Sequence, residues 1–280
     1  MNILIQNTQF TGKQLLHLER VDSTNNYAKQ VIANSTPKDG TVILADEQFA
    51  GRGQAGNKWQ SEAGKNLTFS ILYHTSFLRA DEQYYLNMAV SLGVRKAIEM
   101  EMKEEYEPRI KNQELRSINE DIEKSLVADL FPVTIKWPND IFAGEKKIAG
   151  ILIENTIQGQ FLNYSVIGIG INVNQTVFET GLSASSITLL NNKQADLVQL
   201  FKNALYLIEY YFLKLKMKDY AAIKTAYMEH LMGYRQSLTY RKGQFLFEGS
   251  ITDIDPAGKL MLQVGDYVQT FQFKEIERVF

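Results

Sequence analysis

The chain contains no cysteine, and this absence excludes several kinds of chemistry at once. Disulfides, a thiol nucleophile and zinc sites with cysteine ligands all require that side chain. Histidine is scarce as well, since only His17, His74 and His230 are present and no HExxH motif occurs. A histidine-ligated metal centre is therefore not expected.

The sequence also lacks membrane, export and nucleic-acid signals. No apolar run reaches the roughly 18 residues that a membrane-spanning helix needs, and residues 1–6 lack the basic start and apolar core of a signal peptide. The net charge of −2 provides no overall basic field to attract nucleic acid. We therefore expect a cytoplasmic protein that binds neither membranes nor nucleic acid. Its 280 residues, 45% of them hydrophobic, suffice for one large domain and a small one.

Residues 51–59 read GRGQAGNKW and form the most informative segment of the chain. Glycine has the most backbone freedom to lose, so three glycines in this stretch predict a mobile loop whose N–H groups can surround an anion. Arg52 and Lys58 add positive charge, and Trp59 adds an aromatic anchor. A strand-like run at 67–73 follows, whereas the common phosphate-binding glycine motifs open a helix. By its spacing alone, the segment would equally fit a flexible surface turn.

Hydrophobic periodicity predicts strands and helices through the first part of the chain. A helix is expected to begin near Thr24, with Ser23 or Thr24 as its N-cap. Three successive strands with tight turns after residue 133 favour an antiparallel or mixed sheet over a βαβ array. The predicted strands are 15–21, 41–45, 67–73, 133–137, 148–155 and 161–171, and further helices are predicted through Leu86, Val90, Val94 and Ile98, over 196–216 and over 220–232.

Two segments differ from this pattern. About half of residues 101–129 are charged, with both signs mixed, and Pro108 is expected to interrupt any helix there. We interpret this segment as a solvated helical extension or a partly mobile insertion. Beyond Gly233, four short strands separated by turns predict a small β-barrel. They are 237–240, 244–253, 259–264 and 267–273.

Three further motifs support a functional interpretation of the glycine loop. They are DSTNN at 22–26, KWPND at 136–140 continued by KKIAGILIE at 146–154, and IGIGINVN at 167–174. Their order and spacing resemble the biotin protein ligase family, from about Leu18 to the C-terminus. The resemblance implies an α+β fold: a mixed sheet with helices like that of class II aminoacyl-tRNA synthetases, followed by the small β-barrel. We expect a catalytic domain at 1–233, with 101–129 as an insertion, and the barrel domain at 234–280.

Activation of a carboxylic acid by ATP brings two anions together, so its site requires fixed cations and backbone donors. The acyl-adenylate hydrolyses readily, so a loop must exclude water. Lys147 precedes an apolar strand that would hold it rigidly, and Asp140 is suited to Mg²⁺. Taken alone, Lys147 also fits a surface lysine at a hairpin end, Asp140 a turn residue, and Ser23 a helix cap.

The resemblance assigns these residues to a site. It implies that Lys147 contacts the carboxylate of biotin, with Arg52 as the second catalytic cation, and that Asp140 lies on the nucleotide and metal side. The implied biotin-binding set is Ser23, Thr24, Asn25, Gln48, Gly51, Arg52, Gly53, Gln54, Lys147, Gly150, Leu152 and Gly168. The implied nucleotide-binding set is Arg52, Gly56, Trp59, Lys136, Asn139, Asp140, Lys147 and Asn172, with Asp140 as the candidate Mg²⁺ ligand.

The chain departs from the family pattern in two places. The family's loop often reads GRGRRG, whereas Gln54 and Ala55 stand at the second and third arginines here. Residues 183–188 align with a segment that can carry an adenine-covering tryptophan in relatives, and none is present. We therefore expect Arg52 to carry more of the loop's electrostatic role, and the adenine to be covered in another way.

The resemblance implies a ligase that uses ATP and biotin, with Mg²⁺, to form biotinyl-5′-AMP and then biotinylates a lysine of a biotin carboxyl carrier protein. A homodimer is expected. The alternatives are a lipoate ligase or related acyl transferase, a biotin-responsive repressor and an inactive binding module. The repressor is disfavoured because fewer than about 20 residues precede the catalytic region, too few for a helix-turn-helix. Intact Arg52, Asp140 and Lys147 argue against the inactive module.

Overall fold

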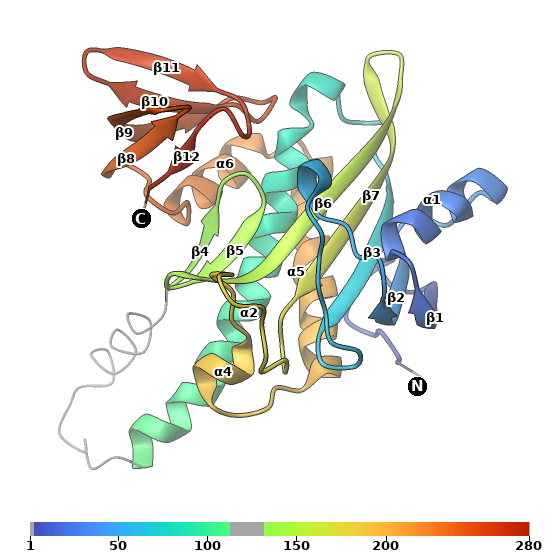
Figure 1. Cartoon of the computed structure of the whole chain (residues 1–280). Helices are drawn as coiled ribbons and strands as arrows, with labels where there is room; N and C mark the ends of the chain where they lie inside the picture. Colours follow the sequence, from blue (N-terminus) through green and yellow to red (C-terminus); the bar gives the residue numbers. More distant parts are fainter. Residues whose placement is uncertain (1–2, 113–131, 280) are drawn as a thin grey trace.

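A seven-stranded mixed sheet forms the centre of the computed structural model, which describes residues 3–112 and 132–279, with the backbone alone for 104–112 (Figure 1). The strand order is β1-β2-β3-β7-β6-β5-β4. β1 and β2 are parallel and all other neighbours are antiparallel. The strands are β1 (Leu15–Val21), β2 (Thr41–Gln48), β3 (Leu67–His74), β4 (Val133–Lys136), β5 (Asp140–Ala143), β6 (Lys146–Gln158) and β7 (Phe161–Ile171).

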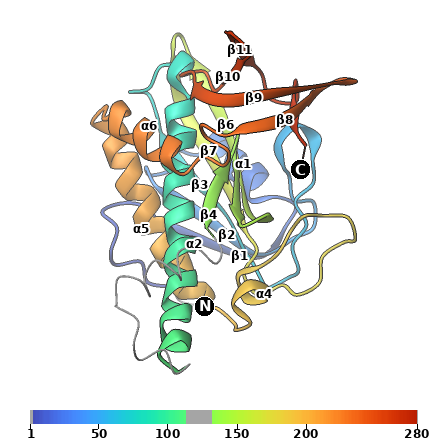
Figure 2. The same cartoon turned by 90° about the vertical axis from the view of Figure 1, so that its left-hand side faces the viewer.

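Helices cover the two faces of this sheet unequally (Figure 2). α2 (Tyr84–Asn112), α5 (Leu197–Lys216) and α6 (Tyr220–Glu229) lie on one face, and α1 (Thr24–Asn34) lies on the other. Because side chains alternate along a strand, Val42 and Leu44 of β2 enter the main core while Ile43 packs under α1. A short helix, α4 (Ile187–Asn191), follows the sheet, and single 3-10 turns lie at Gln54–Gly56 and Ala80–Glu82.

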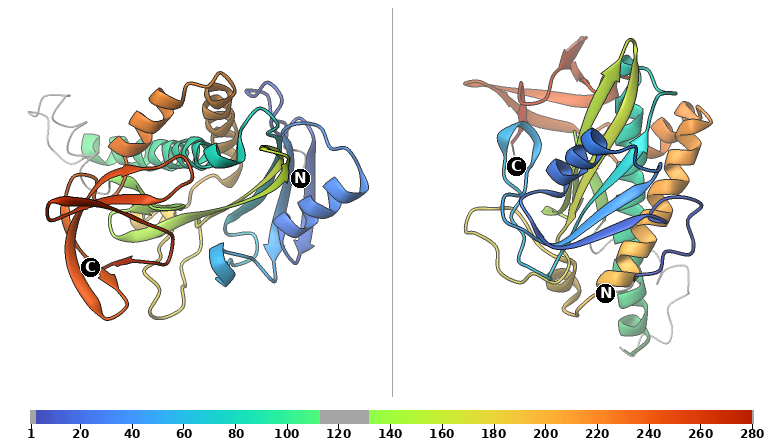
Figure 3. Two further views of the ribbon diagram at one scale, coloured as in Figure 1. Left: turned by 90° about the horizontal axis from the view of Figure 1, so that it is seen from above. Right: turned by 90° about the vertical axis from the view of Figure 1, so that its right-hand side faces the viewer.

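A second, five-stranded antiparallel sheet follows α6, in the order β11-β10-β9-β8-β12. It lies at the β4–β5 end of the central sheet, whereas α1 lies towards the other end (Figure 3). The predicted short strands are confirmed. In the described residues the edge strands β11 and β12 do not pair with each other, so closure into a barrel stays a prediction. The strands are β8 (Ser237–Lys242), β9 (Phe245–Ile254), β10 (Leu260–Val264), β11 (Tyr267–Phe271) and β12 (Glu277–Arg278).

The predicted mixed sheet and helices are confirmed, with two differences. The short elements β5, α4 and β12 were not expected, because hydrophobic periodicity is weak over so few residues. The expected break at Pro108 is wrong, since α2 continues through it to Asn112. Proline removes one helical hydrogen bond, and strong helix formers such as Glu104 and Lys111 surround it here. The remainder of the expected insertion lies outside the described residues.

The packing of α2 on α5 depends on one glycine. A Cβ at Gly93 would lie 2.7 Å from the Ile208 Cα, so only glycine permits this approach of the two helices. No described helix is both long and apolar enough to span a membrane.

A buried carboxylate fastens the N-terminal segment to α5. Glu209 is 3% exposed and accepts hydrogen bonds from the backbone N–H groups of Gln9, Phe10 (3.0 Å) and Thr11 (2.7 Å). The Thr11 hydroxyl also contacts the Tyr73 hydroxyl at 2.8 Å. Three backbone donors thus depend on one side chain.

Replacement of Glu209 by alanine is expected to lower the free energy of unfolding by about 3 kcal/mol, because it leaves buried N–H groups without an acceptor. Glu209→Gln, which keeps one acceptor oxygen, should cost less. Urea denaturation measures both effects. Glu229→Ala, at an exposed position of α6, is the matched control and should change the value by less than about 0.5 kcal/mol. Equal effects at Glu209 and Glu229 would show that the carboxylate does not hold the segment.

Candidate active site

A cavity of about 180 Å³ lies on the face of the central sheet opposite α2 and α5. It gathers residues from the start of α1, the glycine loop, the KWPND turn, β6, β7 and the end of the second sheet. Its lining residues are Ser23, Thr24, Asn25, Gln48, Arg52, Gly53, Gln54, Asn57, Lys58, Trp59, Lys136, Trp137, Pro138, Asn139, Asp140, Lys147, Gly150, Ile151, Leu152, Gly168, Ile169, Gly170 and Phe273.

Glycines on two paired strands form the floor of this cavity. Gly150 of β6 pairs with Gly170 of β7, and Leu152 pairs with Gly168. The Trp59 indole lies on the first pair, since a Cβ at Gly170 would be 2.3 Å from its Cε2 and a Cβ at Gly150 would be 3.1 Å from its Cζ3. Asn25 likewise lies against Gly168, so the protein's own side chains approach these glycines closely.

The polar end of the cavity is built at the start of α1. Ser23 is the N-cap residue, but its side chain makes no capping bond. Gln48 Oε1 accepts from the backbone N–H of Thr24 (2.7 Å) and from its hydroxyl (3.1 Å). The Ser70 hydroxyl contacts both the Thr24 hydroxyl and Asn25 Oδ1 at 2.7 Å. These contacts fix Thr24, Asn25 and Gln48 in one orientation, while the Ser23 hydroxyl is not used by the helix.

The charged end of the cavity holds an ion pair. Lys147 Nζ lies 2.7 Å from Asp140 Oδ1 and 5.8 Å from the centre of the Trp59 ring. The backbone of Lys147 is fixed by two hydrogen bonds. Its N–H donates to Ser183 O, and its carbonyl oxygen accepts from the Ser185 N–H. Burial lowers the pKa of Lys136, and the positive charge of Lys147 acts in the same direction while Asp140 opposes it. The lining holds four basic side chains, Arg52, Lys58, Lys136 and Lys147, and one carboxylate, Asp140, so basic groups exceed acidic ones.

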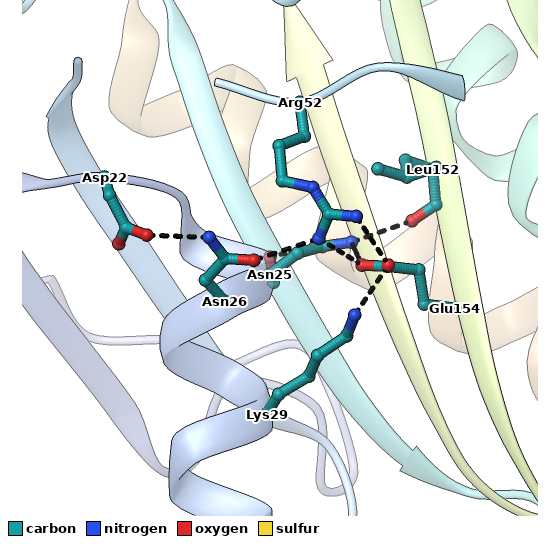
Figure 4. Close-up of polar contacts among 8 residues, drawn as sticks. Asp22, Asn25, Asn26, Lys29, Arg52, Leu152 and Glu154 are labelled. Atoms are coloured by element: carbon teal, nitrogen blue, oxygen red, sulfur yellow. Dashed lines mark hydrogen bonds and ion pairs between the residues drawn. The ribbon is translucent and has the colours of Figure 1, made fainter. Parts of the chain in front are cut away.

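Arg52 leaves the glycine loop toward β6 and α1 (Figure 4). Its guanidinium donates to Glu154 through Nη2 (3.0 Å) and Nη1 (3.2 Å), and to Asn26 Oδ1 through Nη1 (2.9 Å). Lys29 Nζ approaches the same Glu154 carboxylate at 2.6 Å, and Asn25 Nδ2 does so at 2.9 Å. Glu154 thus connects the loop, the first helix and the sheet.

The glycine loop itself is folded as a hairpin. Arg52 and Lys58 form an isolated antiparallel bridge, and Gly53 N–H donates to Asn57 O at 2.7 Å. The tip is a single 3-10 turn in which Ala55 has a left-handed φ of 53°. Lys274, beyond the second sheet's β11, donates to Ala55 O at 3.0 Å. The connection between β11 and β12 therefore contacts the loop directly.

Most residues implied by the family resemblance lie together in this cavity. Three do not line it: Gly51, Gly56 and Asn172. Asn172 directly follows β7 and is buried, and its Nδ2 donates to Ser185 O at 3.1 Å. Phe273 was missed because nothing in a lone aromatic residue of the C-terminal region indicates a distant pocket. Trp137 packs against the main core and also lines the cavity, and its Nε1 donates to Gly258 O at 3.0 Å.

Several polar atoms near the cavity lack partners within the described residues. Buried atoms without a hydrogen bond include Gln54 Oε1, Trp59 Nε1 and Asn172 Oδ1. Such atoms are uncommon and often point to an absent ligand. The described part of the chain has no cluster of three or more metal-ligating His, Asp or Glu side chains. Asp140 is the one carboxylate in the described lining, which suits an Mg²⁺ ion held largely by substrate phosphates and water.

Gly170→Ala is expected to displace the Trp59 indole, because the added Cβ would overlap its ring. Overpacking of this kind costs about 1–3 kcal/mol in stability. The indole should also become more exposed, so its fluorescence emission should shift to the red. Gly249→Ala is the control, since a Cβ there would meet its nearest neighbour at an ordinary 3.4 Å. An unchanged spectrum for Gly170→Ala would contradict the packing of Trp59 on this strand pair.

Comparisons with known proteins agree with this architecture. Among curated relatives, the bifunctional ligase/repressor BirA of Escherichia coli is 32% identical over 72% of this chain and 56% of that protein. The biotin–[acetyl-CoA-carboxylase] ligase of Mycobacterium tuberculosis is 26% identical over 90% of this chain and 84% of that protein. The biotin protein ligase from Aquifex aeolicus, solved with biotin and ATP, has the same fold, with a TM-score of 0.70 and 24% identity over 95% of this chain and all of that one. Residues 17–172 match the model of the biotin/lipoate A/B protein ligase family, and the chain belongs to that family.

Proposed function

We propose that the chain is a biotin protein ligase that forms biotinyl-5′-AMP and pyrophosphate from biotin and ATP and then transfers biotin to a lysine of a biotin carboxyl carrier protein. One observation carries this proposal: the lining of the cavity holds four cations and one carboxylate. The cations are Arg52, Lys58, Lys136 and Lys147, and the carboxylate is Asp140. This excess of positive charge suits a site that must hold a carboxylate and a triphosphate together. The relatives named as biotin ligases support biotin as the acid.

In the first step, a carboxylate oxygen of biotin attacks the α-phosphorus and the bond to the β-phosphate breaks, so pyrophosphate leaves with the electron pair. Lys147 would contact both the attacking carboxylate and the α-phosphate. Its present partner, Asp140, lies at 2.7 Å and holds the ammonium in place until a substrate carboxylate competes for it. Arg52 would supply the second cation from the loop.

In the second step, the acceptor lysine attacks the acyl carbon and AMP leaves. The amine must be deprotonated to attack, and the proton it loses passes to solvent or to the departing phosphate. The enzyme positions the reactants and excludes water, and no side-chain nucleophile takes part. This mechanism is compatible with a chain without cysteine.

The polar end of the cavity would bind the ureido ring of biotin. A ureido group offers one acceptor and two donors, and Ser23, Thr24 and Gln48 provide hydroxyl and carboxamide groups there. The Ser70 hydroxyl contacts both Asn25 Oδ1 and the Thr24 hydroxyl. The apolar chain of biotin would lie along β6 and β7. The proposed biotin contacts also include Gly51, Gly53, Gln54, Gly150, Leu152 and Gly168.

The nucleotide would occupy the side formed by the KWPND turn. Lys136, Asn139 and Asp140 lie there with Trp59. Asn172 lies outside the lining, but its unpartnered Oδ1 supports a role toward the adenine after a local rearrangement. Gly56 would act through the loop backbone. Asp140 would hold Mg²⁺ together with the ATP phosphates, and the ion would neutralise charge on the leaving pyrophosphate.

Further features complete this proposal. We assign the catalytic domain to 1–233 and a small barrel domain to 234–280, the core being related to class II aminoacyl-tRNA synthetases. We further propose a cytoplasmic homodimer. The family model also covers lipoate ligases, so a lipoate ligase is the alternative.

Purified protein should catalyse ATP–pyrophosphate exchange with Mg²⁺ and biotin, and not with lipoate. Lys147→Gln should lower the exchange rate at least a hundredfold, because it removes the charge between the two anions. Lys146→Gln is the matched control, since Lys146 is the exposed neighbour outside the cavity. Exchange with lipoate alone would overturn the substrate assignment. No exchange with either acid, in folded protein, would overturn the adenylation chemistry.

Gln54→Arg is expected to slow the release of biotinyl-5′-AMP several-fold, because it restores a loop cation beside the cavity. A single charge-assisted contact is worth about 1.5–3 kcal/mol when it is well formed. Release is measured by dilution of preformed complex and chromatography of free adenylate. Gln60→Arg, outside the lining, is the control. Equal release from wild type and Gln54→Arg would contradict a role for this position in retention.

A further inference from the structure

Glu154 occupies a particular place on β6. Side chains two residues apart on a strand share a face, so Gly150, Leu152 and Glu154 project from the same side. The first two line the cavity, and Glu154 stands just beyond them, outside the lining. Its side chain is 20% exposed and meets both the glycine loop and α1 (Figure 4).

Its carboxylate accepts from three side chains of two other elements. Lys29 and Asn25 come from α1, at 2.6 and 2.9 Å, and Arg52 comes from the loop, at 3.0 Å to the same oxygen that Lys29 contacts. Burial alone would raise the pKa of Glu154, but the hydrogen bonds from Lys29 and Asn25 and the charge of Arg52 outweigh it and lower the pKa. The group is therefore a carboxylate throughout the neutral pH range.

The contacts fix Arg52 without using all of its donors. Three of the five N–H groups of a guanidinium are engaged here, two with Glu154 and one with Asn26. Asn26 is itself held by Asp22 at 2.7 Å. A bidentate pair sets the plane of the guanidinium as well as its position. Within the described residues, the other two N–H groups make no hydrogen bond and can serve a ligand in the cavity that Arg52 lines.

The same carboxylate orients Asn25 at the polar end of the cavity. Asn25 is 3% exposed and donates through Nδ2 to Leu152 O (3.2 Å) and to Glu154. Its Oδ1 lies against Gly168 and accepts from Ser70. Without Glu154, Asn25 would lose the better of its two acceptors. One side chain thus contacts both the glycine loop, through Arg52, and the polar end of the cavity, through Asn25.

We propose that Glu154 is a positioning residue that holds Arg52 and Asn25 in fixed positions relative to each other. The glycine loop and the start of α1 then bind biotin together. The expected change in KM rests on the proposed function, whereas the expected loosening of the glycine loop rests on the contacts of Glu154 alone. Loss of the carboxylate should free the loop from the sheet and loosen adenylate retention together with biotin binding.

The test compares Glu154→Ala and Glu154→Gln with Glu47→Ala. Glu47 pairs with Arg20 at 3.1 Å on β2 and does not line the cavity, so it is a matched strand glutamate. Glu154→Ala should raise the KM for biotin in pyrophosphate exchange about tenfold, the loss expected for one charge-assisted hydrogen bond. It should change kcat less than KM and speed adenylate release. Glu154→Gln, which keeps an acceptor, should show a smaller change in KM.

A double-mutant cycle separates positioning from a general structural effect. Arg52→Ala should raise KM in the wild-type background, and it should have much less effect once Glu154 is alanine. Additive effects of the two changes would overturn the proposal, as would a KM for Glu154→Ala equal to that of Glu47→Ala. Circular dichroism and thermal unfolding identify variants that fail to fold, and Glu154→Gln then carries the test.

Limited trypsin digestion tests the structural part without activity. Cleavage after Arg52 in ligand-free protein should be several-fold faster in Glu154→Ala than in wild type or Glu47→Ala. If exchange is absent from wild type but cleavage changes as expected, the proposed function fails and the loop anchor stands. If exchange is present and cleavage is unchanged, the anchor is wrong and the function stands.

Discussion

The register between β6 and β7 is the constraint on which the site depends. It pairs Gly150 with Gly170 on the cavity side, and it pairs Ile151 with Ile169, two lining residues that are 2% and 3% exposed and belong to the main core. A shift of one residue would exchange these faces, placing isoleucines in the cavity and glycines in the core. Burial of the two isoleucines in the core with α2 and α5 therefore fixes which face of the sheet carries Gly150 and Gly170. Trp59 and Asn25 can then reach the sheet only because no Cβ stands in their way.

The second sheet contributes to the site by holding two motifs from outside. Its turn before β10 accepts from Trp137 Nε1 through Gly258 O, and Lys274 donates to the glycine loop at Ala55. On the core side, the Tyr84 hydroxyl donates to Pro138 O at 2.9 Å and meets the Tyr227 hydroxyl at the same distance. The KWPND turn is thus held between the helices and the second sheet. The loop and the turn share one set of supports although they lie far apart in the sequence.

Charge in the site is arranged in two separate pairings. Lys147 has Asp140 within the cavity, whereas Arg52 has Glu154 at its border. Each cation is thereby oriented before a ligand arrives, which lowers the cost of organising it during reaction. The cavity nevertheless retains an excess of positive charge, because Lys58 and Lys136 also line it. An anionic ligand is the natural counterpart of such a surface.

The sequence by itself determined most of the secondary structure, the mixed sheet and most of the residues that line the cavity. β7 spans Phe161–Ile171, as the apolar pattern predicted, and Lys147, Asp140 and Gln48, which the family resemblance implied, line one cavity. Local patterns succeed in these cases because period, turn residues and motif order are encoded in neighbouring positions. They failed at Pro108, where the cost of one proline is smaller than the stability of a long helix.

Only the tertiary structure decided which side chains meet. Glu154 is the last residue of the KKIAGILIE motif on β6, but nothing in that motif indicates that its side chain meets Lys29, Arg52 and Asn25. Phe273 enters the cavity from the far end of the chain, and Asn172 turns away from the lining to Ser185. These outcomes depend on the order of strands in the sheet and on the placement of the second sheet. Such long-range pairings arise from the packing of the whole molecule, and no local pattern in the sequence specifies them.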